Sequence, residues 1–67
     1  MGTITIINVG PAPISVRITG GDDSLTPILP GGQGKWERDK PEVATILKVS
    51  GVEELPVEPG KTYTIGL

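Results

Sequence analysis

The chain has 67 residues, contains neither cysteine nor histidine, and carries a formal net charge of −2. Disulfides and the two commonest zinc ligands are therefore excluded, and a domain of this size buries only about 60% of the surface that its unfolded chain exposes. We expect one small domain over residues 1–67 that gains stability by self-association, the common support that remains for so short a chain.

The distribution of charge disfavours binding to nucleic acid. The six basic residues form no run, and the chain has one tryptophan and one tyrosine. A nucleic-acid-binding domain normally carries a basic face. No segment approaches the roughly 20 apolar residues that cross a bilayer, and the N-terminus lacks the charged-then-apolar order of a signal peptide. We expect no nucleic-acid partner, no membrane span and no cofactor, and the cellular compartment stays open.

Turn residues divide the first half of the chain into three short segments that predict strands. Thr3–Asn8 is rich in β-branched residues, which favour strands. Ile14–Thr19 alternates apolar and polar residues, which indicates a strand with one buried face. Leu25–Leu29 predicts a short strand that Pro27 confines to a sheet edge or a bulge, because proline cannot donate to a ladder.

The second half of the chain predicts further strands. Lys35–Asp39 is a short polar strand, and Thr62–Leu67 closes the chain as a strand. Glu42–Val49 contains helix-forming residues, but its β-branched residues favour a strand, and its apolar residues on both faces indicate a central one. Val52–Val57 is either irregular or an edge strand.

Short strands separated by turns predict an all-β fold. The expected architecture is a small antiparallel β-sandwich or barrel of about six short strands, with no long helix. The alternating strand supplies one side of the expected core, and the longest apolar segment and the last strand supply the other. The expected core residues are Ile14, Val16 and Ile18 with Val43 or Ala44, Ile46 or Leu47, and Ile65.

Two proline-glycine loops raise the question of phosphate binding. A P-loop needs Gly-x-x-x-x-Gly-Lys-Ser/Thr ahead of a helix. Leu55 stands where the first glycine would precede Gly60, and Lys35 is followed by tryptophan rather than by serine or threonine. Proline followed by glycine is instead typical of a type II turn, in which the glycine has a positive φ. We predict such turns at Gly31 and Gly60, and no bound nucleotide.

The same two loops share a spacing. In each, Pro-x-x-Pro-Gly is followed by a few residues and then by an aromatic residue. Two copies are too few to establish a repeat, so we interpret the spacing as one good turn used twice. Its members are Pro27, Pro30, Gly31 and Trp36 in the first copy and Pro56, Pro59, Gly60 and Tyr63 in the second.

Residues for catalysis or metal binding are sparse. The serines have no histidine to activate them. Glu37 and Asp39 share a strand face, as a carboxylate pair would, but so short a chain leaves little room for a substrate cleft. Asp22 and Asp23 offer calcium two carboxylates where six or more oxygens are needed. We therefore expect no catalytic residues, no metal site and no enzyme activity.

The two aromatic residues are candidates for a binding surface. Trp36 shares its strand face with Arg38, so its ring either packs on the core or lies near the surface, and both interpretations stay open. In the surface interpretation, Trp36 and Tyr63 stack on a sugar, and the chain is a small carbohydrate-binding, lectin-like module. A small inhibitor or immunity-type binding partner is a third hypothesis, without a motif of its own.

The first hypothesis is a non-enzymatic structural or assembly module that acts as a homo-oligomer, such as a component of a virion, an appendage or a surface layer. Thr3–Ile7 is the expected contact, since Ile4 and Ile6 lie on one face and Ile7 on the other. A terminal strand with unpaired backbone groups and no lysine or proline is a natural pairing site. The expected partner is a second copy, or else another protein or a glycan.

Overall fold

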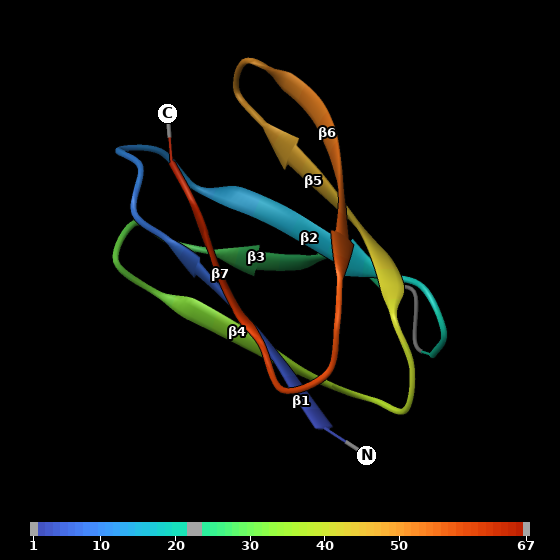
Figure 1. The fold of residues 1–67 in the computed structure, drawn as a ribbon. Coiled ribbons are helices and arrows are strands. Elements are labelled where there is room, and N and C mark those ends of the chain that lie inside the picture. Colours follow the sequence, from blue (N-terminus) through green and yellow to red (C-terminus); the bar gives the residue numbers. More distant parts are fainter. Residues whose placement is uncertain (1, 22–23, 67) are drawn as a thin grey trace.

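The computed structural model describes residues 2–21 and 24–66, which form two β-sheets and contain no helix (Figure 1). The predicted all-β fold is confirmed, as a sandwich. None of these residues lies in a helix of the length and apolar character needed to cross a membrane. The strands are β1 (Gly2–Asn8), β2 (Ile14–Ile18), β3 (Thr26–Ile28), β4 (Gln33–Arg38), β5 (Glu42–Lys48), β6 (Gly51–Val57) and β7 (Thr62–Ile65).

The three-stranded sheet has the order β4-β1-β7, and the four-stranded sheet has the order β3-β2-β5-β6. Every pair is antiparallel except β1 with β7, which is parallel. The predicted antiparallel pairing is therefore confirmed for every pair except this one. The cause of the exception is the turn after β6, which delivers the chain to the end of the sandwich where β1 begins, so that β7 runs in the same direction as β1.

The first strand lies in the middle of its sheet. Ile4 pairs with Trp36 of β4, and Ile6 pairs with Tyr63 of β7, so both edges of β1 are occupied. The expectation that Thr3–Ile7 is an unpaired edge is wrong. Being first in the chain does not make a strand an edge, because later segments can add to either side of it.

Alternation along the strands fills the space between the two sheets. Ile4, Ile6 and Val16 are fully buried, whereas Thr5 and Ser15 on the opposite faces are partly exposed. The predicted core face of β2 and its partners Ala44, Ile46 and Ile65 are confirmed as buried. The complete apolar core is Ile4, Ile6, Ile14, Val16, Ile18, Ile28, Ala44, Ile46, Val57 and Ile65.

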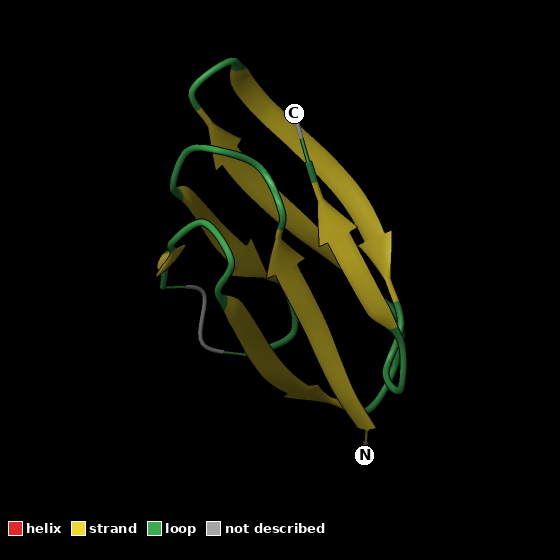
Figure 2. Cartoon of the chain, turned by 90° about the vertical axis from the view of Figure 1, so that its left-hand side faces the viewer, coloured by secondary structure: helices red, strands yellow, loops and turns green. Residues whose placement is uncertain are grey.

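The positions of three strands within the four-stranded sheet agree with their composition. β3, with Pro27, lies at one edge, and β5 lies between β2 and β6 as predicted. Val52–Val57 belongs to a regular edge strand, β6. Of the two predicted alternatives, irregular structure or an edge strand, the second is confirmed. Figure 2 shows that β3 and β4 border one side of the sandwich, and β6 and β7 border the other.

The proline-glycine loops are the turns that the sequence predicts. Gly31 and Gly60 have φ values of 81° and 85°. The Gly32 amide donates to Leu29 O over 2.8 Å, and the Lys61 amide donates to Glu58 O over 3.3 Å, which closes a four-residue turn in each case. Each turn carries the chain from an edge of the four-stranded sheet to an edge of the three-stranded sheet. The shared spacing therefore reflects two equivalent corners.

Candidate functional site: an apolar end of the sandwich

Three connections meet at one end of the sandwich, which we call the apolar end. Residues 9–13 join β1 to β2, residues 29–32 join β3 to β4, and residues 49–50 join β5 to β6. Figure 1 shows the first two of these connections side by side at the upper left, near the C-terminal end of β7. The apolar end is thus built from both sheets.

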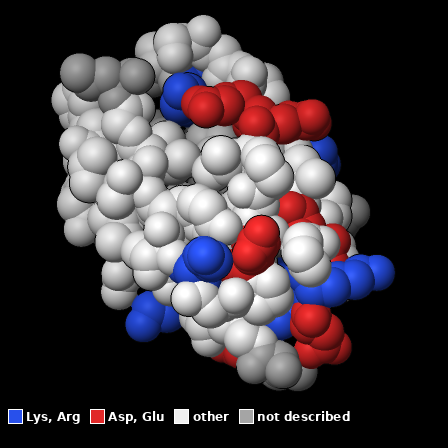
Figure 3. All heavy atoms as spheres, viewed as in Figure 1, with Lys and Arg blue, Asp and Glu red and all other residues white. Residues whose placement is uncertain are grey.

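Large aliphatic side chains at the apolar end point into solvent. The exposed fractions are 61% for Val9, 67% for Leu29 and 85% for Val49. Along the upper left edge of the surface in Figure 3, the described residues show no charged side chain, whereas basic (blue) and acidic (red) side chains lie at the upper right and in the lower part. An apolar, uncharged surface of this kind is typical of a contact region.

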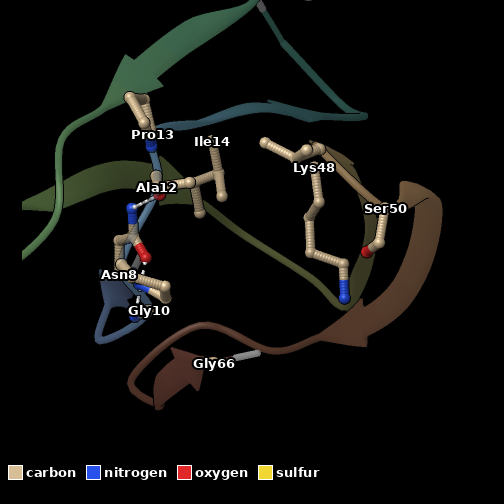
Figure 4. Close-up of a pocket in the computed structure, with 10 residues that line it drawn as sticks. Asn8, Gly10, Ala12, Pro13, Ile14, Lys48, Ser50 and Gly66 are labelled. Atoms are coloured by element: carbon tan, nitrogen blue, oxygen red, sulfur yellow. Dashed lines mark hydrogen bonds between the residues drawn. The ribbon is translucent and has the colours of Figure 1, made fainter.

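A buried amide organises this end from below. Asn8 is 1% exposed, and its Nδ2 donates to Ala12 O over 2.8 Å and to Ile28 O over 3.0 Å. Its Oδ1 accepts from the Gly10 amide over 3.0 Å (Figure 4). Its backbone exchanges two further bonds with Gly31 and Gly32. One side chain therefore fixes the shape of two connections, and no buried side-chain nitrogen or oxygen in the described residues lacks a partner.

A cavity of about 210 Å³ opens between residues 10–14 and the turn after β5. Figure 4 shows Asn8, Ala12 and Pro13 on one side, Lys48 and Ser50 on the other, and Gly66 below. Since the Asn8 amide is used by the backbone, the wall on its side is largely apolar. The residues that line the cavity are Asn8, Gly10, Pro11, Ala12, Pro13, Ile14, Lys48, Val49, Ser50 and Gly66.

The rim of this cavity carries one ion pair. Lys48 Nζ lies 2.6 Å from Glu53 Oε1, and the two side chains are 19% and 47% exposed. An exposed pair of this kind contributes at most about 1 kcal/mol to stability. Because the ammonium group is already paired, the chemistry that the cavity offers is mainly burial of apolar groups.

The aromatic residues proposed for sugar binding both face the interior. Trp36 and Tyr63 pack against the core from β4 and β7, with β1 between them. The Trp36 ring folds over Gly34, where an added Cβ would lie 2.6 Å from ring atom Cη2. The Tyr63 hydroxyl accepts from the Glu58 amide over 2.8 Å. The structure favours the core interpretation of Trp36 and brings the two rings onto no common outer platform.

The other candidate contact residues are separated by the fold. Ile4 and Ile6 are core residues, whereas Ile7 lies on the outer face of its sheet and is partly exposed. Arg38 faces the opposite sheet, where its guanidinium donates to Thr19 O over 2.9 Å and to Ile18 O over 3.1 Å. The six residues proposed from the sequence therefore form no single surface.

The acidic residues considered for catalysis and for metal binding have other surroundings. Glu37 Oε2 accepts from Thr3 Oγ1 over 2.6 Å on the outer face of the three-stranded sheet. Asp22 and Asp23 lie outside the described residues. Within residues 2–21 and 24–66, no group of three or more acidic side chains is placed to hold a metal ion.

Asn8 is a residue of the candidate site that was not predicted, although the sequence contains a local signal for its role. The Asn-Val-Gly triplet at positions 8–10 allows the asparagine side chain to bond the backbone two residues on. Pro11 and Pro13 have a fixed φ, and the connection that contains them forms one wall of the cavity. An asparagine followed within two residues by a run of small and cyclic residues was the available clue.

Comparison with known proteins gives no relative, since no family model, curated protein or solved structure matches the chain. Its function is therefore inferred from its own residues.

Proposed function

We propose that the chain is a non-enzymatic structural module that works as a homo-oligomer, and that its apolar end is a contact between copies. The observation that carries this proposal is the exposure of Val9, Leu29 and Val49 beside an apolar cavity. Placing such side chains in water costs about 25 cal/mol for each Å² that a partner could cover. A partner surface that covers them gains this free energy.

A second copy suits this surface for two reasons. The exposed aliphatic side chains of the apolar end are uncharged, and Lys48, which lines its cavity, is paired with Glu53, so two copies can face each other with little opposition of like charges. A stable contact buries about 800 Å² on each partner, whereas the described surface totals 4001 Å². A contact of that size would cover about a fifth of this surface.

Sedimentation velocity over a range of concentrations tests the proposal. We expect the wild type to associate at micromolar concentration and Val49→Glu to sediment as a smaller species, because the carboxylate would be buried in the contact. Val43→Glu is the matched control, since Val43 is 41% exposed near the start of β5, whereas Val49 follows the end of that strand. It should associate as the wild type does.

Thermal melts of both variants must show that they remain folded. A wild type that sediments as a folded monomer at every accessible concentration would overturn the proposal. Association that Val43→Glu weakens and Val49→Glu leaves intact would remove the apolar end from the contact.

A further inference from the structure

The two sheets leave four edges, and three of them carry features that discourage pairing with another strand. β3 has three residues, one of which is Pro27. β4 carries charged side chains at three of its six positions. β6 contains Pro56 and two adjacent glutamates. Prolines, charges and short length are the means by which proteins protect sheet edges.

Proline blocks the free edge of β6 directly. The Val43 amide donates to Thr19 Oγ1 over 3.0 Å, and Val43 O accepts from the Thr19 amide over 3.1 Å, so both groups point toward β2. Val43 and Pro56, which face each other, are therefore not a hydrogen-bonded pair. The backbone of Pro56 must point outward, where the residue has no N–H to offer.

The fourth edge, β7, is also short, at four residues, but it lacks the other two features. Its sequence, Thr-Tyr-Thr-Ile, contains no proline and no charge. Lys61 O accepts from the Thr5 amide over 3.1 Å, and Ile65 O accepts from the Val9 amide over 2.9 Å, so alternate residues of this segment point toward β1. The residues between, Thr62 and Thr64, point their N–H and C=O groups away from β1, toward the free edge.

We propose that β7 is a second contact between copies, in which it pairs antiparallel with β7 of another copy across a twofold axis. This inference rests on the proposed function and names a further surface for it. In the pairing, Thr62 faces Thr64 of the second copy and Thr64 faces its Thr62, which gives four backbone hydrogen bonds. The two three-stranded sheets become one sheet of six strands.

The side chains of β7 are compatible with pairing to a copy of itself. Thr62 and Thr64 are exposed on the outer face, where threonines opposite each other form favourable cross-strand pairs. Tyr63 would face its own counterpart on the inner face, which brings two aromatic rings together. No like charges meet within the four residues, in contrast to the glutamates of β6.

Two separate self-complementary surfaces lead to more than a dimer. The β7 edge runs along a side of the sandwich, whereas the apolar end closes it at one end (Figures 1 and 2). A copy that uses both surfaces joins two neighbours, so the assembly extends as an array. Loss of one surface should therefore stop the assembly at the dimer.

Thr64→Pro tests the edge by giving β7 the feature that Pro56 gives β6. We expect this variant to sediment as a dimer, the combination of Thr64→Pro with Val49→Glu as a monomer, and the wild type as a larger species. Thr64→Val is the matched control, since valine keeps both the backbone N–H and the β-branched shape. It should assemble as the wild type does.

Amide hydrogen exchange supplies a measurement that does not depend on the proline variant. In Val49→Glu, the amides of Thr62 and Thr64 should gain at least tenfold protection as concentration rises through dimer formation. The amides of Tyr63 and Ile65, which point toward β1, should be protected at every concentration.

The outcomes separate the two proposals. If the wild type dimerises and Val49→Glu is monomeric, or if Thr64→Pro assembles as the wild type does, the β7 contact is overturned and the apolar end stands. If Val49→Glu still dimerises but the Thr62 and Thr64 amides exchange freely, both contacts are overturned. If Val49→Glu assembles as the wild type does while Thr64→Pro is monomeric, the β7 contact stands alone. A monomeric wild type overturns both.

Discussion

The two ends of the sandwich differ in the hydrogen bonds that join the two sheets. At the polar end, formed by Thr19, Arg38, Glu42 and the turn at Gly60, the partly exposed Arg38 bridges the layers by donating to Ile18 O and Thr19 O at the end of β2. Within the four-stranded sheet, Thr19 Oγ1 donates to Glu42 Oε1 over 2.7 Å. At the apolar end, the bridging group is the buried amide of Asn8.

The difference shows what each end presents to its surroundings. Where charged and hydroxyl groups on the surface make the hydrogen bonds of an end, water satisfies their remaining donors and acceptors, and no partner protein is needed. At the apolar end the hydrogen bonds that join the layers are buried, so the outer surface can consist of Val9, Leu29 and Val49, whose side chains make no hydrogen bonds. The same structural need thus leaves one end hydrated and the other apolar.

The largest expected loss of stability comes from removing the buried amide at the apolar end. Asn8→Ala should lower the free energy of unfolding by about 3 kcal/mol, because it leaves Ala12 O, Ile28 O and the Gly10 amide without their partner. Chemical denaturation measures the change. Asn8→Asp is the matched control for shape: it restores the acceptor for Gly10 but faces two carbonyl oxygens with a carboxylate, so it should be no more stable than Asn8→Ala. Recovery of wild-type stability in Asn8→Asp would contradict the role of Nδ2.

A smaller effect is expected midway between the ends. Val16 is fully buried, with Ile46 opposite on β5. Val16→Ala should lower the free energy of unfolding by about 1–3 kcal/mol through lost burial and the cavity that remains. Ser15→Ala, on the other face of the same strand, serves as the control in the same denaturation experiment and should change stability by less than about 0.5 kcal/mol.

The two corners allow the ends to be compared by one substitution. Gly31 lies at the apolar end and Gly60 at the polar end, with φ values of 81° and 85°, and an added Cβ would meet nothing within 4 Å at either. Gly31→Ala and Gly60→Ala should each cost about 1 kcal/mol, from backbone strain alone. Adding nucleotide should not change the thermal stability of the wild type or of either variant. If the losses in unfolding free energy of the two variants differed by more than about 1 kcal/mol, the two corners would not be equivalent.

The smallest effect is expected at the polar end. Arg38→Met keeps much of the aliphatic stem and removes the two bonds from the guanidinium to Ile18 O and Thr19 O. Because this site is partly exposed, water can replace the lost donor, and the change should be about 0.5–1 kcal/mol in a denaturation curve. A loss as large as that of Asn8→Ala would mean that the ends do not differ in the way proposed.

Local patterns in the sequence were sufficient for the strands, the corners and much of the core. Alternation at Ile14–Ile18 marked the buried face of β2, and proline before glycine marked both turns. The position of β1 within its sheet could not be predicted in the same way. β-Branched residues favour edge and central strands alike, and the strands that pair with β1 come from distant segments of the chain. Ile4 and Ile6 were therefore assigned to a contact surface, whereas they belong to the core.

The candidate site was less accessible to such reasoning. Its apolar residues come from three connections that are distant in sequence, and only the fold brings Val9, Leu29 and Val49 to one end. The orientation of backbone groups on β7 depends on its parallel register with β1, which no composition reveals. Asn8 alone had a local signal, the glycine two residues later.

The parallel pairing of β1 and β7 decides how the molecule could be displayed. Because the two strands run the same way, Gly2 lies at the polar end and Gly66 beside the apolar cavity (Figure 1). A linker attached before Gly2 would hold the molecule on a solid support with its apolar end directed outward. A linker attached at Gly66 would instead crowd that end. A biosensor surface prepared with each attachment in turn would therefore present opposite poles of the same molecule.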